Sequence, residues 1–194
     1  MSTAHIDQDG VLGLFRSSGA LLEGHFRLSS GLHSGGYLQC ALVLQHPRHA
    51  EQLGQALGAK LAALGATVVL SPAMGGLIIG HEVGRALGVR AIFAERVEKT
   101  LTLRRGFTLT STDRVVIIED VVTTGGSTRE TIVVAEAAGA KVVGAGSVID
   151  RSGGNSNLGV PFESLVTLNL PTYQPEACPM CAKGEPVVKP GSRN

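Results

Sequence analysis

Two adjacent acids and the short loop after them are the residues of this chain best suited to chemistry. Glu119 and Asp120 follow residues 115–118, which are all Val or Ile and predict a buried strand. The loop 123–127 reads Thr-Thr-Gly-Gly-Ser and leads into a helical pattern over 128–138. Carboxylates can accept hydrogen bonds from paired sugar hydroxyls. Such a loop can hold a phosphate with backbone N–H groups, hydroxyls and the positive end of a helix. Together they indicate a site for a phosphorylated ribose.

The acid pair carries more of this argument than the glycines do. A buried strand followed by a Gly-rich turn and a helix is common in α/β proteins. Two neighbouring carboxylates after an apolar strand, however, repel each other and cost stability unless a ligand or solvent satisfies them. The loop lacks the Gly-Lys-Ser/Thr of a Walker A loop and the Gly-x-Gly-x-x-Gly of a dinucleotide site. A ligand-binding role is therefore favoured over plain architecture.

The composition limits the class of protein. The chain has 194 residues, of which 43% are hydrophobic, enough for one domain with a sizeable core. A net charge of +1 and the lack of Trp argue against nucleic acid as a partner. Residues 1–10 do not resemble a secretory signal, and no run of 18 apolar residues predicts a membrane span. We therefore expect a cytoplasmic protein that binds small molecules, not nucleic acid or membranes.

Strand and helix patterns alternate along most of the chain. A first helix is predicted at 7–17, and a hairpin and loop at 24–39 form a small N-terminal hood. Helical segments then separate apolar strands, which we predict at 67–71, 90–94, 114–118, 141–149 and 165–170. This order predicts an α/β fold, with a central, mostly parallel sheet flanked by helices.

Ligands of such sheets bind beyond the carboxyl ends of the strands. Three loops should meet there, at residues 72–76, 119–127 and 150–154. The first offers glycines for close backbone approach, the second an acid pair and a phosphate loop, and the third the cation Arg151. This combination would suit a phosphorylated sugar with a diphosphate and an anionic partner.

Cys178 and Cys181 have the Cys-x-x-Cys spacing of half a zinc site or of a redox pair. A zinc site needs a second pair of ligands, and no second Cys-x-x-Cys or paired His motif follows. A redox pair is expected near the start of a βαβ unit, not in a Pro-rich tail. We expect two ordinary thiols in a C-terminal turn, with zinc and a disulfide as alternatives.

Three segments in order resemble one family. The block 115–127 resembles the phosphoribosyl diphosphate signature of type I phosphoribosyltransferases, two acids followed by a Thr- and Gly-rich phosphate loop. Residues 24–34 resemble the Gly-x-Phe-x-Leu-x-Ser-Gly-x-x-Ser motif of the members that act on orotate, and Arg151 resembles their base-binding arginine. The resemblance covers residues 10–183. It implies the type I phosphoribosyltransferase fold as one domain, 1–194, with residues 1–45 as the hood over the base site.

The resemblance implies transfer of a phosphoribosyl group from 5-phospho-α-D-ribose 1-diphosphate (PRPP) to orotate. The products would be orotidine 5′-phosphate and diphosphate, in pyrimidine biosynthesis. It also implies Mg²⁺ carried by the diphosphate without dedicated protein ligands, and a homodimer with shared active sites. The alternatives are a purine phosphoribosyltransferase and a non-catalytic PRPP sensor that binds RNA. A neutral purine does not need Arg151, and the low net charge argues against RNA.

The resemblance further implies roles for single residues. Lys99, in the basic segment 95–106, and Asp120 are the catalytic candidates, and the segment would close over the diphosphate. Thr123 and Arg151 would contact orotate, and His25 and His33 would either lie near the base or be structural. The residues implied to bind PRPP are Glu119, Asp120, Val121, Val122, Thr123, Thr124, Gly125, Gly126, Ser127, Arg96 and Lys99.

Overall fold

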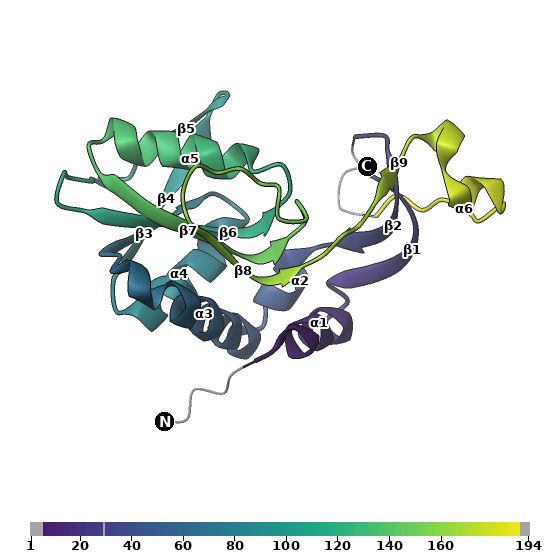
Figure 1. Ribbon diagram of the computed structural model, residues 1–194, viewed down its shortest axis with the longest axis horizontal. Helices are drawn as coiled ribbons and strands as arrows, with labels where there is room; N and C mark the ends of the chain where they lie inside the picture. The colour runs from purple at the N-terminus through teal and green to yellow at the C-terminus, as the bar shows by residue number, and fades with distance from the viewer. Residues whose placement is uncertain (1–5, 29, 191–194) are drawn as a thin grey trace.

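The computed structural model describes residues 6–28 and 30–190, so residues 1–5 and Ser29 of the predicted hood lie outside it. Within the described residues, six strands form the larger sheet in the order β5-β4-β3-β6-β7-β8 (Figure 1). Every neighbouring pair is parallel except β4 and β5. The predicted mostly parallel sheet is confirmed. The strands are β3 (Val68–Pro72), β4 (Arg90–Val97), β5 (Thr100–Leu103), β6 (Arg114–Val122), β7 (Lys141–Asp150) and β8 (Phe162–Thr167).

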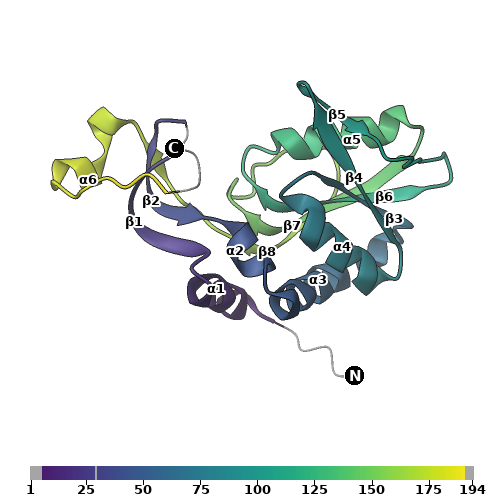
Figure 2. The ribbon, with the colours of Figure 1, turned by 180° about the vertical axis from the view of Figure 1, so that it is seen from behind.

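Helices cover both faces of this sheet (Figure 2). Helices α3 (Pro47–Leu61) and α4 (Gly76–Leu87) pack on one face, and α5 (Gly126–Ala137) packs on the other. The central strand β6 shows why the sheet is sandwiched. Val116 and Ile118 belong to the core under α3 and α4, whereas Val115 and Ile117 belong to the core under α5. Side chains alternate along a strand, so four consecutive apolar residues bury both faces.

Strand β6 is longer than the sequence predicts. It runs to Val122, so Glu119 and Asp120 lie inside the strand and not after it, which corrects our expectation. The cause is β7, which pairs with β6 as far as Val122 and Asp150. On its other side, β6 pairs with β3 only as far as Ile117. The acid pair (Glu119 and Asp120) therefore lies where β6 is paired on one side only, next to the loop that follows β3.

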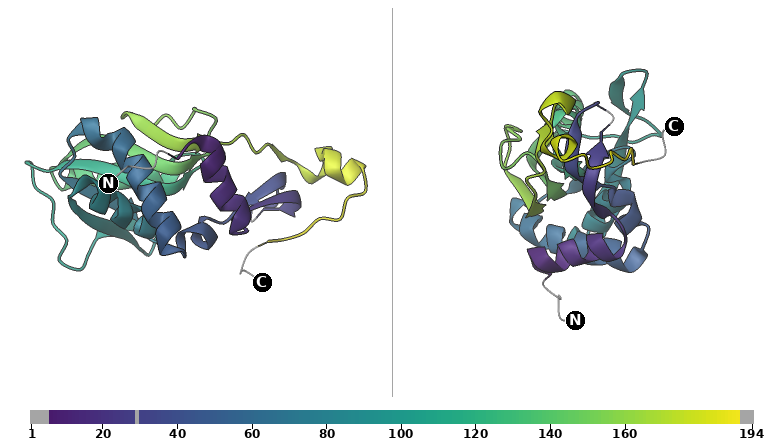
Figure 3. Two further views of the ribbon diagram at one scale, coloured as in Figure 1. Left: turned by 90° about the horizontal axis from the view of Figure 1, so that it is seen from below. Right: turned by 90° about the vertical axis from the view of Figure 1, so that its right-hand side faces the viewer.

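A small antiparallel sheet of β1 (Leu21–Arg27), β2 (His33–Leu38) and β9 (Thr172–Tyr173) stands beside the larger one (Figures 1 and 3). The predicted hairpin is β1 and β2, whereas β9 was not predicted. Helices α1 (Gln8–Ser17) and α2 (Cys40–Leu44) join the small sheet to the rest of the fold. The short turns are η1 (Ala62–Leu64), η2 (Pro175–Ala177) and α6 (Pro179–Ala182). No helix among the described residues is both long and apolar enough to cross a membrane.

Candidate active site

The acid pair is buried with few partners. Glu119 is 8% exposed and Asp120 is partly buried. Glu119 Oε1 accepts the N–H of Asp120 at 3.3 Å, and Asp120 Oδ1 accepts the N–H of Val121 at 2.8 Å. In the described part of the chain, neither carboxylate forms an ion pair. Two buried acids with only local backbone donors keep hydrogen-bonding capacity for a ligand.

Burial shifts the protonation of both acids, and the charge of Asp120 adds to the shift of Glu119. Desolvation, followed by the nearby charge of Asp120, raises the pKa of Glu119 from an ordinary 4.5 to about 9. Desolvation also raises the pKa of Asp120. The same field reaches Cys40 at the start of α2, because its pKa is raised first by burial and then by Asp120 and Glu119. The start of α2, which follows β2 of the small sheet, therefore lies near the acid pair.

A cavity of about 260 Å³ opens beside Glu119 and over the start of α5. Gly125 precedes this helix with φ of 75°, a left-handed conformation that glycine adopts without strain. The turn places the hydroxyl residues at the cavity, where the first N–H groups of the helix are free for an anion. The lining residues are Glu119, Val121, Val122, Thr123, Thr124, Gly125, Gly126, Ser127, Thr128 and Glu130. Of the residues implied to bind PRPP, the cavity gathers all but Asp120, Arg96 and Lys99.

The phosphate loop (residues 123–127) is held by a residue that sequence analysis missed. Arg129 donates to the carbonyl of Thr124 through Nη2 and to that of Ser156 through Nη1, both at 2.8 Å. Thr131 Oγ1 donates to the carbonyl of Ser127 at 2.8 Å. These bonds hold the loop through its carbonyl groups, and neither Arg129 nor Thr131 lines the cavity. In the sequence, Arg129 is only an arginine in the first turn of a helix, and such residues are too common to indicate a role.

The loop at 72–76 approaches the acid pair through its backbone. A β-carbon placed on Gly75 would lie 2.7 Å from Oδ1 of Asp120, and one on Gly76 would lie 2.7 Å from the carbonyl of Ile118. Only hydrogen fits at both positions. The loop backbone therefore lies directly against Asp120, while its approach to a diphosphate stays a prediction.

The basic segment 95–106 forms a hairpin of β4 and β5, with Lys99 exposed in the turn. Arg96 links this turn to the cavity. Its Nη1 donates to the carbonyl of Lys99 at 2.6 Å, and its Nη2 lies 2.7 Å from Oε2 of Glu130. Since Glu130 lines the cavity, Arg96 lies at its rim. Lys99 is held near the same rim through its backbone, with its side chain in solvent.

Arg151 follows β7 at the same edge of the sheet. Its N–H donates to the carbonyl of Val122 at 2.7 Å. Asp150 shapes the loop, because its carboxylate accepts the N–H groups of Ser152 and Gly154 at 2.7 and 3.1 Å. Burial lowers the pKa of Arg151, and its Nε is buried without a hydrogen-bond partner among the described residues. A buried guanidinium N–H without a partner is costly, so it is a good candidate for ligand contact.

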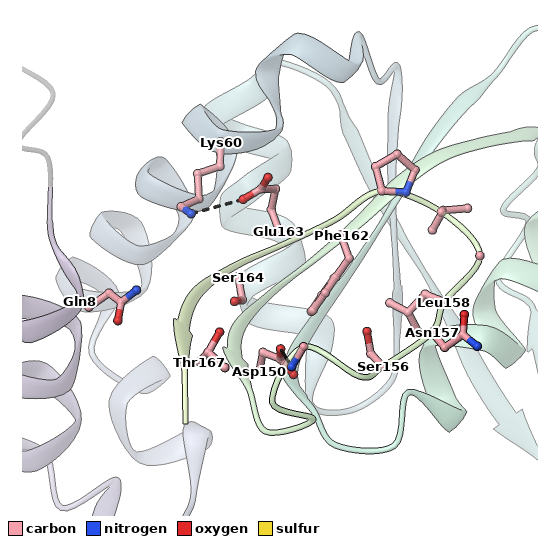
Figure 4. Close-up of a pocket in the computed structure, with 14 residues that line it drawn as sticks. Gln8, Lys60, Asp150, Ser156, Asn157, Leu158, Phe162, Glu163, Ser164 and Thr167 are labelled. Carbon is pink, nitrogen blue, oxygen red and sulfur yellow. Dashed lines mark hydrogen bonds and ion pairs between the residues drawn. The ribbon is translucent and has the colours of Figure 1, made fainter. Parts of the chain in front are cut away.

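A larger hollow of about 670 Å³ lies on the other side of Asp150, between α3 and the chain from β7 to β8 (Figure 4). Lys60 and Glu163 form an ion pair at its wall, with Nζ 3.3 Å from Oε2. None of the residues implied to bind PRPP or orotate lines it. We therefore assign the site to the smaller cavity, which has the acid pair and the phosphate loop.

His25 and His33 do not face this cavity. Both are buried in the small sheet, with Nε2 of His25 2.8 Å from Nδ1 of His33, and both lie against the C-terminal cysteines. Of the two roles considered for these histidines, the structural one fits their position better.

Comparison with solved structures defines the class of protein. Orotate phosphoribosyltransferase from Aeropyrum pernix superposes with a TM-score of 0.68 at 25% identity, over 81% of this chain and 93% of that one. The Mycobacterium tuberculosis H37Rv enzyme in complex with PRPP gives 0.68 at 24% identity, over 84% and 97%. No protein-family model matches the chain. The shared fold, with an acid pair and a phosphate loop at its sheet edge, is that of a phosphoribosyltransferase.

Curated relatives narrow the class. Orotate phosphoribosyltransferase of Pelotomaculum thermopropionicum is 52% identical over 96% of this chain and 98% of its own length. That of Heliobacterium modesticaldum is 53% identical over 97% and 100%. The chain belongs to the orotate phosphoribosyltransferase family. The predicted fold class, family and enzyme class are confirmed.

Proposed function

We propose that this chain transfers the phosphoribosyl group of PRPP to orotate, giving orotidine 5′-phosphate and diphosphate. The observation that carries the proposal is the acid pair beside the cavity of the phosphate loop, at the sheet edge where Arg151 also lies. The family supports the same reaction.

The ribose 5-phosphate part of PRPP fits the cavity. The 5′-phosphate would accept hydrogen bonds from the hydroxyls of Thr123, Thr124 and Ser127 and from the first N–H groups of α5. Glu119 and Asp120 would accept the 2′- and 3′-hydroxyls of the ribose. Two donors from one sugar would satisfy carboxylates that have only local backbone partners, so binding relieves a cost present in the free protein.

Catalysis would stabilise charge on the departing diphosphate. The transition state of such a transfer has oxocarbenium character at the ribose, and negative charge grows on the leaving group. Backbone N–H groups of the loop 72–76 and the cations Arg96 and Lys99 would meet that charge. Asp120, held against Gly75, would fix the ribose relative to the diphosphate, so much of the rate would come from positioning.

Orotate would bind next to Arg151 and Thr123. A guanidinium can hold a carboxylate or two ring carbonyls in a planar, bidentate manner. The unpartnered Nε of Arg151 gives this residue a donor to contribute. A purine has no carboxylate for it, so the observation favours orotate over the purine alternative.

Mg²⁺ would arrive with the diphosphate. Mg²⁺ prefers oxygen ligands and commonly binds substrate phosphates with few protein carboxylates. Among the described residues, one group of three or more close metal-ligating side chains occurs, and it contains His and Cys, outside the cavity. Mg²⁺ bound with the diphosphate would neutralise part of its negative charge beside the acid pair.

We also propose that the protein acts as a cytoplasmic homodimer of one domain, 1–194, in which residues 1–45 cover the base site. The exposed turn at Lys99 and the exposed Val97 beside it suit a hairpin that reaches a second copy. The position of Cys40 beside the acid pair supports a small sheet close to the base site.

The function is tested by following orotate absorbance after mixing protein, Mg²⁺, PRPP and orotate, with adenine and hypoxanthine as competing bases. We expect turnover of orotate but of neither purine, and no turnover when Mg²⁺ is left out. Turnover with a purine but not with orotate would contradict the proposal. Binding of PRPP without turnover of any base would favour the sensor alternative.

A further inference from the structure

We infer that His25, His33, Cys178 and Cys181 form a structural zinc site that fastens the C-terminal segment (residues 171–190) to the small sheet. One ligand atom from each of the four residues lies within 4.8 Å of the other three. This site is separate from the proposed active site and does not depend on the reaction.

The distances suit one tetrahedral ion. With Zn–S of about 2.3 Å and Zn–N of about 2.0–2.1 Å, tetrahedral geometry requires N···S separations of about 3.6 Å and N···N of about 3.3 Å. Cys178 Sγ lies 3.5 Å and Cys181 Sγ 3.7 Å from His25 Nε2. Cys181 Sγ lies 3.3 Å from His33 Nδ1, while the two histidine nitrogens are 2.8 Å apart. A shift of about half an ångström between the rings would complete the geometry.

The histidines are oriented as ligands. His25 in β1 and His33 in β2 face each other across the hairpin, with Nε2 of His25 2.8 Å from Nδ1 of His33. Nδ1 of His25 lies 2.8 Å from the carbonyl of Glu185, which can accept only from an N–H. Nδ1 therefore carries the proton and Nε2 presents its lone pair to the other three ligands. Metal-binding histidines commonly have such a backbone partner.

The cysteines are held at a turn. Cys178 lies directly before α6 and Cys181 within it, and Cys178 is 3% exposed. From the sequence, zinc was only an alternative, because no second ligand pair follows the cysteines. The second pair precedes them instead, about 150 residues earlier, on the β1–β2 hairpin. Because both thiols contact a buried histidine pair, the geometry favours the zinc alternative over two ordinary thiols.

The C-terminal segment has little else to hold it. From 171 to 190, Cys178 is the one buried residue among those described. The segment contacts the small sheet through β9 and through backbone bonds of Val188 with Arg27 and His25. Two-residue strands and exposed side chains supply little burial, and small units of this kind are commonly stabilised by a metal or disulfide.

The ligand set identifies the ion. Two thiolates and two imidazoles suit zinc, and four protein ligands close the tetrahedron, which is typical of structural and not catalytic sites. A two-iron cluster with two Cys and two His needs the pairs on separate irons. Four ligand atoms this close favour a single ion.

The direct test is the metal content of protein purified with reductant and zinc and then dialysed. We expect one zinc per chain in the wild type and in the controls Cys40→Ser and His81→Gln. We expect loss of most of it in Cys181→Ser and His33→Gln. Wild type without zinc, or full zinc in a Cys178→Ser/Cys181→Ser double variant, would overturn the inference.

Two further readouts do not depend on the variants. Cobalt exchanged into the wild type should give the strong visible bands of a tetrahedral thiolate site, and octahedral-type weak bands would count against it. A chelator should speed proteolysis within 171–190 in the wild type. A Cys178–Cys181 disulfide in protein kept with zinc would indicate a redox pair instead.

Discussion

Gly75 lies directly against the carboxylate of Asp120, so a β-carbon there would stand 2.7 Å from Oδ1 and 3.0 Å from Oδ2. The loop after β3 and the acid pair on β6 are therefore one structural unit. Gly75 belongs to the proposed diphosphate site and Asp120 to the proposed sugar site. A change that moves either residue should therefore disturb both sites.

Gly75→Ala should lower kcat/KM by about 100-fold, because displacing a reacting group by about 1 Å costs on that order. Folding should survive, since Gly75 is exposed. Gly13→Ala is the matched control: nothing lies within 4 Å of its β-carbon, and it is in the interior of α1. The control should keep full activity and gain about 0.5–1 kcal/mol of stability. Equal activity in both variants would refute the close contact.

Asp120→Asn should stabilise the free protein while weakening PRPP binding. Asp120 is a desolvated acid with a raised pKa, so replacing it should stabilise the protein by about 1 kcal/mol and raise Tm by about 2–4 °C. Loss of a charged acceptor for the ribose should raise the Kd for PRPP about 10- to 100-fold. Calorimetry and titration with PRPP measure the two effects.

Asp113→Asn is the control variant, for which we expect a change in Tm of the opposite sign. Burial raises the pKa of Asp113, but hydrogen bonds from Thr110 and Arg90 outweigh it and lower the pKa. Neutralising this well-partnered acid should lower Tm and leave PRPP affinity unchanged. A fall in Tm for Asp120→Asn as well would contradict the strained acid pair.

The stability of the protein should depend on pH because the pKa of Glu119 is raised on folding. Its pKa is raised in the folded protein, so the folded state binds more protons than the unfolded state between pH 4.5 and about 9. Its contribution is complete below pH 4.5 and is lost as pH rises toward about 9. Glu119→Gln removes that loss. The Tm of this variant minus that of wild type should increase across the interval, and a constant difference would contradict the shifted pKa.

Lys99→Ala should lower kcat about 10²- to 10³-fold, the usual effect of removing one group that stabilises transition-state charge. Tm should not change, because the side chain is exposed. Lys141→Ala, an exposed lysine at the opposite end of the sheet, should leave kcat unchanged. Unchanged turnover in Lys99→Ala would remove Lys99 from the mechanism.

Arg151→Lys should raise the KM for orotate about 10- to 100-fold while PRPP affinity holds, since an ammonium cannot reproduce a bidentate fork. The surface variant Arg16→Lys should change neither value. A parallel loss of PRPP affinity in Arg151→Lys would place the residue at the sugar site and not at the base.

The sequence predicts five of the six strands of the larger sheet from local patterns, but it misses β5 and places β8 three residues too late. Residues 115–118 are apolar on both faces, and Pro47 and Gly88 mark helix ends. The end of β6 was misplaced because two acids, Glu119 and Asp120, interrupt its apolar run before Val121 and Val122. Only pairing with β7, a tertiary contact, keeps Glu119 and Asp120 in the strand.

The same reason explains what the sequence could not show at the sites. Arg129 is an ordinary helix residue until the fold brings it to the phosphate loop. Arg96 was implied by the family resemblance, but its ion pair with Glu130 depends on the fold. The four proposed zinc ligands lie at opposite ends of the chain. Their convergence depends on pairing of β2 with the two-residue β9, whose sequence gives no strand signal.

A crystal structure of the protein with PRPP and Mg²⁺ tests the central claim most directly. The ribose 2′- and 3′-hydroxyls should lie within hydrogen-bonding distance of Glu119 and Asp120, with the 5′-phosphate over the start of α5. PRPP bound in the larger hollow near Lys60, or carboxylates of the acid pair left facing solvent, would contradict the account.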